Sequence, residues 1–154
     1  MANLKALAKD TAIYGLSSIV GRFLNYLLVP LYTHVISAAS GGYGVVTNLY
    51  AYTALLLVVL TFGMETTFFR FMNDEKEEHD TVFSVAFGVI ALLTSVFLGL
   101  VFGFSSSVSS ALGYADNPEY VQLMACVVAL DALQALPFCH LRYRHKAMRF
   151  ASLK

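Results

Sequence analysis

Long apolar runs without charge dominate the pattern of hydrophobic and polar positions along this chain. No Asp, Glu, Lys or Arg occurs from Phe23 to Met64 or from Thr81 to Ala115. A third apolar run, from Tyr120 to His140, contains Asp131 as its only charged residue. Because a helix needs about 20 apolar residues to cross the ~30 Å hydrocarbon core of a bilayer, this pattern predicts membrane-spanning helices.

The first run is too long for one crossing, and the small residues from Ser37 to Gly42 favour a turn within it. We therefore expect an all-α, polytopic membrane protein with four spans. Their predicted limits are about 11–35, 43–71, 81–105 and 119–140, with a Ser-rich loop at 106–118 and a basic connector at 141–154. Strands of a β-barrel would alternate over about 10 residues, and the run Ala54–Leu60 does not alternate.

The composition agrees with a membrane protein and leaves few other classes. Hydrophobic residues make up 58% of the 154 residues and charged residues 13%, whereas soluble domains have about 45–50% and 25%. Intrinsic disorder needs low hydrophobicity and high net charge, so it is excluded. The two cysteines, Cys126 and Cys139, lie in one apolar stretch, which gives no disulfide framework or metal cluster.

The positions of the cations predict the orientation of the chain. Nine of the ten precede the first span, bracket the loop after the second or follow the fourth: Lys5, Lys9, Arg70, Lys76, Arg142, Arg144, Lys146, Arg149 and Lys154. Arg22, the tenth, lies inside the first span. The loops at 36–42 and 106–118 have none. With an even number of spans, both termini are expected in the cytoplasm.

A cleaved signal peptide is the other reading of the N-terminal region. Lys5 and Lys9 suit its charged segment, and Ser37–Ala39 weakly resembles a cleavage site. Against it, Arg22 and Asn25 interrupt the apolar segment, and three more spans follow. We therefore expect the first span to be retained.

Three ionisable residues are expected at membrane depth, where a charge is costly and normally faces a partner, a cavity or a pathway. Arg22 and Asp131 lie about eleven and twelve residues into their spans, near the bilayer midplane, and Glu65 lies about two turns from the end of its span. Arg70 is close enough to that end for its charge to reach the interface. The two open readings are a structural ion pair of Arg22 with a carboxylate and a polar cavity.

Other polar residues share helix faces with these groups. Asn25 and Tyr26 follow Arg22 at i+3 and i+4, and Gln134 follows Asp131 at i+3. A simple lipid anchor has no need of such polar stripes. We therefore take Arg22, Asn25, Tyr26, Glu65, Arg70 and Asp131 as candidates for substrate binding or for lining a cavity.

The chain lacks the short motifs of common catalytic sites. It contains no G-x-x-x-x-G-K-[ST], H-E-x-x-H, C-x-x-C or G-x-S-x-G. We therefore expect no enzyme activity, no metal and no cofactor. The basic residues after the fourth span are expected to contact membrane lipids rather than nucleic acid, because they directly follow an apolar helix.

Several segments in order along the chain resemble one transporter family. They include Leu7–Gly15, Ile19–Arg22, Leu28–Thr33, Phe62–Arg70 and Leu141–Ser152. The chain resembles the polysaccharide biosynthesis and O-antigen flippase proteins of the multidrug/oligosaccharidyl-lipid/polysaccharide exporter superfamily.

The resemblance implies a two-bundle transporter that moves undecaprenyl-diphosphate-linked oligosaccharides from the cytoplasmic to the periplasmic leaflet of the bacterial inner membrane. It implies that Arg22 contacts a pyrophosphate or an acidic sugar and that Glu65 and Arg70 form a gate or a cavity wall.

Length is the main departure from this family, because four spans are about a third of such a transporter. We expect the four helices to be part of its first bundle, completed by further helices of a longer reading frame or by another chain. The alternatives are a multidrug and toxin extruder and a small membrane scaffold or subunit.

Overall fold

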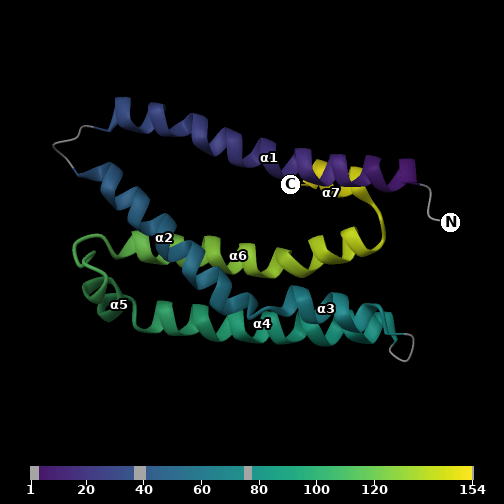
Figure 1. Cartoon of the computed structure of the whole chain (residues 1–154). Helices are drawn as coiled ribbons and strands as arrows, with labels where there is room; N and C mark the ends of the chain where they lie inside the picture. The colour runs from purple at the N-terminus through teal and green to yellow at the C-terminus, as the bar shows by residue number, and fades with distance from the viewer. Residues whose placement is uncertain (1–3, 37–40, 75–77, 154) are drawn as a thin grey trace. The chain divides into compact units, whose positions relative to one another are not determined.

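A computed structural model describes residues 4–36, 41–74 and 78–153, and these residues form helices and no strand (Figure 1). The helices are α1 (Leu4–Val35), α2 (Gly42–Thr61), α3 (Met64–Met72), α4 (His79–Gly103), α5 (Ser105–Ala111), α6 (Pro118–Tyr143) and α7 (Ala147–Leu153). The chain divides into two compact units, one of residues 1–46 and 140–154 and one of residues 47–139. Each unit is described by itself.

Four helical segments of the described chain are long and apolar enough to cross a membrane. They are Thr11–Val35, Gly42–Met72, His79–Gly103 and Pro118–Tyr143. Large apolar side chains such as Leu130 are exposed along these segments, as expected of surfaces that face lipid rather than water. The predicted all-α, polytopic membrane fold with four spans is confirmed.

The second span is broken, whereas the sequence analysis predicted one continuous helix over 43–71. α2 ends at Thr61 and α3 begins at Met64. Between them Phe62 and Gly63 have φ values of 45° and 69°. A residue in this left-handed region cannot continue a right-handed helix, and glycine adopts it at little cost. An isolated glycine in an apolar run was too weak a signal for this break.

α3 is amphipathic and packs against α4 in the 47–139 unit. Phe68 and Met72, one turn apart, are fully buried. The Phe68 ring lies edge-on to Phe83 of α4, with 6.2 Å between the ring centroids. These contacts attach the short helix α3 to the longer α4.

The predicted Ser-rich loop at 106–118 contains a helix, α5. Serine has a modest helix propensity, but here tertiary contacts favour the helix. Ser109 is completely buried, and the Gln122 side-chain amide of α6 donates a 2.9 Å hydrogen bond to the Ser105 hydroxyl. α6 then begins at Pro118, one residue before the predicted start of the fourth span at about 119.

Alanines and larger apolar residues together form the buried face of α6. Fully buried side chains recur along it at helical spacing: Val121, Ala125, Val128, Ala132 and Leu136. The polar residues Asp131 and Gln134 lie outside this buried face.

In the other unit, the predicted connector at 141–154 forms the end of α6, a tight turn and the helix α7. The turn has the hydrogen-bond pattern of a Schellman motif: Lys146 N–H donates to the Leu141 carbonyl and His145 N–H to the Arg142 carbonyl, both at 3.0 Å. His145 takes the left-handed position with φ 51°. This turn folds α7 back so that it contacts α1.

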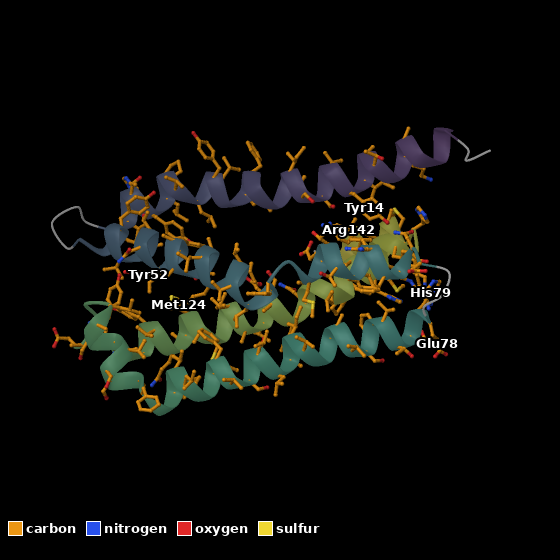
Figure 2. All side chains as sticks on the ribbon, turned by 60° about the horizontal axis from the view of Figure 1, so that its bottom comes forward. Tyr14, Tyr52, Glu78, His79, Met124 and Arg142 are labelled. Carbon is orange, nitrogen blue, oxygen red and sulfur yellow. The ribbon has the colours of Figure 1, made fainter. Side chains whose placement is uncertain are left out.

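An aromatic contact attaches α7 to α1. Phe150 of α7 is 1% exposed, and its ring lies edge-on to Tyr14 with centroids 5.1 Å apart. The Arg142 guanidinium carbon lies 5.0 Å from the Phe150 centroid, within the range of a cation–π interaction. Figure 2 shows Tyr14 and Arg142 near each other in this region.

Candidate functional site

Three of the predicted site residues lie on α1, in the 1–46 part of the chain. The structure describes the backbone of Arg22 and Asn25 as helical, but their side chains lie outside the described residues. Tyr26 is 72% exposed. Of these three side chains, only the exposed Tyr26 ring is described, and the roles of Arg22 and Asn25 stay predictions.

Glu65 directly follows the break in the second span. It lies in the first turn of α3 and is exposed. The carbonyl of Gly63 accepts hydrogen bonds from the N–H groups of Thr66 and Thr67, at 3.0 and 3.3 Å, which start the new helix. A carboxylate in the first turn is stabilised by the partial positive charge of a helix N-terminus. Glu65 therefore marks the start of a half-helix rather than the end of a continuous span.

Arg70 lies in the last turn of the same helix. Phe68 and Arg70 are two residues apart, about 200° around the helix, so the buried Phe68 and the exposed Arg70 occupy opposite faces. Within the described residues no ion pair joins Arg70 to Glu65. Both charged residues of α3 are exposed.

Asp131 forms the best-defined polar contact among the predicted site residues. Its Oδ1 accepts a 2.6 Å hydrogen bond from the side-chain amide of Gln134, one turn along α6. Asp131 is half-buried and Gln134 is exposed. Their face of α6 lies to the side of the buried Val128 and Ala132. The polar pair predicted from the i, i+3 spacing is therefore present.

This pair lies within a candidate span, with Asp131 half-buried and Gln134 exposed. Exposure of a carboxylate to hydrocarbon costs several kcal/mol, about 2.5–3.5 on insertion scales. The face of α6 that carries Asp131 and Gln134 therefore requires either water or polar groups of other helices opposite it. The wall of a polar cavity provides such an environment, because it contains water and polar groups.

Sequence reasoning missed two polar contacts of the 47–139 unit. The Asn48 side-chain amide donates a 3.0 Å hydrogen bond to the Tyr114 hydroxyl, and Gln122 bonds to Ser105 as described above. Each contact joins residues far apart in the sequence, so no local spacing predicts it. Both lie at the end of the unit where α5 connects α4 to α6 (Figure 1).

Comparison with protein families shows to which family this chain belongs. Its sequence matches the family described as "Polysaccharide biosynthesis protein" over residues 7–153. The chain belongs to this family. Comparisons with curated proteins and with solved structures found no match.

Membership of the polysaccharide biosynthesis protein family covers nearly the whole chain and confirms the resemblance inferred from its segments. The matched range includes every predicted site residue, from Arg22 to Asp131. Family membership indicates a role in polysaccharide synthesis or transport. With its four apolar segments, this family member is a multi-pass membrane protein.

Proposed function

We propose that the protein takes part in flipping a lipid-linked oligosaccharide across the bacterial inner membrane during synthesis of a surface polysaccharide such as O-antigen or capsule. The observation that carries this proposal is the Asp131–Gln134 pair. A hydrogen-bonded polar pair within a membrane-spanning helix suits a pathway for a hydrophilic sugar. Family membership directs that pathway to polysaccharide precursors.

The break in the second span supports a transport role. Transporters often build their substrate sites from discontinuous helices near the bilayer midplane. The left-handed residues Phe62 and Gly63 interrupt this span, and Glu65 lies in the first turn after the break. In the proposed mechanism Glu65 and Arg70 belong to the gate or wall of the cavity.

Substrate recognition is assigned to cationic and polar groups. In the proposal Arg22 contacts the diphosphate of undecaprenyl-diphosphate or an acidic sugar, because a guanidinium forms paired hydrogen bonds with phosphate oxygens. Asn25, Tyr26 and Asp131 supply hydrogen bonds to sugar hydroxyls. The oligosaccharide enters from the cytoplasmic leaflet and leaves to the periplasmic one, and the protein acts as a transporter rather than an enzyme.

A packing surface on α4 supports completion of the cavity by other helices. Gly99 and Gly103 are exposed, and a Cβ added at either position meets nothing within 4 Å. Small residues four apart let a second helix approach closely. These helices belong to the rest of the transporter in our proposal; in the alternative, a scaffold or subunit, they belong to different proteins.

The orientation is proposed from the cations, with both termini cytoplasmic. Single cysteines introduced at His79 and Asp116, in a background without Cys126 and Cys139, test it with a membrane-impermeant thiol reagent on intact cells. Labelling at position 116 and protection at position 79 are expected. The reverse pattern would place the termini outside.

Deletion and complementation in the native host test the transport role. We expect cells without the gene to lose the surface polysaccharide and to accumulate its lipid-linked precursor inside the membrane, because synthesis continues but translocation stops. Restoration by the intact gene is the control. Loss of the precursor itself would contradict a flippase and would place the protein in synthesis.

A further inference from the structure

Cationic side chains gather around a concave site where α7 lies against α1. The site has a volume of about 450 Å³. Its polar lining comes from Lys9 of α1, from His145 and Lys146 of the turn, and from Arg149 of α7. Ile13, one turn after Lys9, supplies an apolar wall. Residues more than 130 positions apart in the sequence thus form one site.

Packing next to the site holds these cations in place. The Tyr14–Phe150 ring contact, at 5.1 Å, fixes α7 on α1 one residue away from both Ile13 and Arg149. The Schellman hydrogen bonds of His145 and Lys146 fix the turn. The cations therefore converge because of the fold, and their spacing does not depend on a flexible tail.

The positive charge of the site favours the binding of an anion. The site is lined by the basic residues Lys9, Lys146 and Arg149, and none of the described residues that line it is acidic. Like charges held close together repel one another. Arginine and lysine together are a common phosphate-binding set, since Arg forms paired hydrogen bonds and Lys acts as a point charge.

The site lies at the ends of two candidate spans. Lys9 precedes the Thr11–Val35 segment by two residues, and His145 follows the Pro118–Tyr143 segment by two residues. Basic residues immediately outside a span lie at the level of lipid headgroups. The phosphate of a lipid at this level fits a site that joins cations to the apolar Ile13.

We propose that this site binds the phosphate of an anionic phospholipid headgroup, of the phosphatidylglycerol type, in the leaflet that faces these helix ends. The phosphate lies among Lys9, Lys146 and Arg149, and the lipid's glycerol backbone lies beside Ile13. This site is distinct from the polar groups within the spans and does not depend on the proposed transport function.

Lipid binding to the protein expressed from its complete reading frame and purified in detergent tests this site. Native mass spectrometry gives the Kd for phosphatidylglycerol, with phosphatidylcholine as the neutral comparison. We expect Lys9→Gln and Arg149→Gln each to raise the Kd for phosphatidylglycerol about fivefold, the effect of one cation near a lipid surface. Arg144→Gln is the matched control, because Arg144 is an exposed cation of the same turn outside the lining.

Each outcome supports or overturns the site. An equal loss in Arg144→Gln would show diffuse attraction to charge and would overturn it, as would equal affinity for phosphatidylcholine. Competition by glycerol phosphate at the lipid's own concentration would assign the site to a soluble phosphate and overturn the lipid. Circular dichroism and gel filtration check that the variants fold; because Lys9 and Arg149 are exposed, both variants are expected to pass.

Discussion

The Asp131 carboxylate accepts a 2.6 Å hydrogen bond from the Gln134 side chain on α6, within a candidate membrane span. This contact joins the two main features of the protein. The helix is apolar enough to cross a membrane, and it carries a polar group that hydrocarbon cannot solvate.

Replacement of Asp131 tests whether this side of α6 is functional. Asp131→Leu removes the charge and the acceptor for Gln134, so we expect loss of surface polysaccharide with normal protein levels in the membrane. Asp131→Asn keeps an acceptor oxygen and should retain part of the function. Leu130→Ala, at the neighbouring 67% exposed position, is the control. Normal polysaccharide in Asp131→Leu would exclude a role for this carboxylate.

Arg22 is the second group to test in cells. Arg22→Ala should abolish surface polysaccharide at normal protein levels, because the proposed contact with an anionic substrate is lost. Arg22→Lys keeps the charge without the paired hydrogen bonds and should retain part of it. Loss of the protein itself from the membrane in Arg22→Ala would favour the structural ion pair with Glu65 or Asp131 over substrate contact.

Gly63→Ala tests the break between α2 and α3. At φ 69° an alanine is strained by roughly 1–2 kcal/mol, so we expect a lower thermal unfolding midpoint in detergent. Gly88→Ala, inside α4 with nothing within 4 Å of the added Cβ, should leave the midpoint unchanged or raise it, since Ala has the higher helix propensity. Similar behaviour of the two variants would mean that the second span is a continuous helix.

Phe150→Ala tests the attachment of α7 to α1. Truncation of a buried Phe costs about 3–5 kcal/mol, and here it also removes the contacts with Tyr14 and Arg142. We expect faster tryptic cleavage after Arg149 in the purified protein. Met148→Ala, at a 71% exposed position, serves as the comparison. Equal cleavage rates in the two variants would show that α7 is not held by Phe150.

The sequence was sufficient for the spans and for local polar pairs, and insufficient where tertiary contacts decide. Charge-free runs predicted four spans, and the i, i+3 spacing predicted Asp131 beside Gln134, because both follow from helix geometry. The helix α5 could not be predicted, since Ser109 becomes helical through burial and through the bond between Gln122 and Ser105.

The same reason explains the missed site at the α1–α7 contact. Arg149 and Lys146 were interpreted as a basic connector, and Lys9 as a cation before the first span. Their convergence depends on the left-handed His145, which reverses the chain, and on Phe150. His145 gives no sequence signal for the turn, because the residue at this position of a Schellman turn is usually glycine. The packing of Phe150 against α1 is a contact between distant residues, which no local spacing predicts.

Translocation by the purified protein is the measurement that tests the central claim most directly. Proteoliposomes containing the protein, expressed from its complete reading frame, are loaded with a fluorescent polyprenyl-diphosphate oligosaccharide, and an impermeant enzyme that cleaves the glycan reports its exposure. We expect translocation faster than in protein-free liposomes and loss of this acceleration in Asp131→Leu. Translocation no faster than in protein-free liposomes would contradict the account.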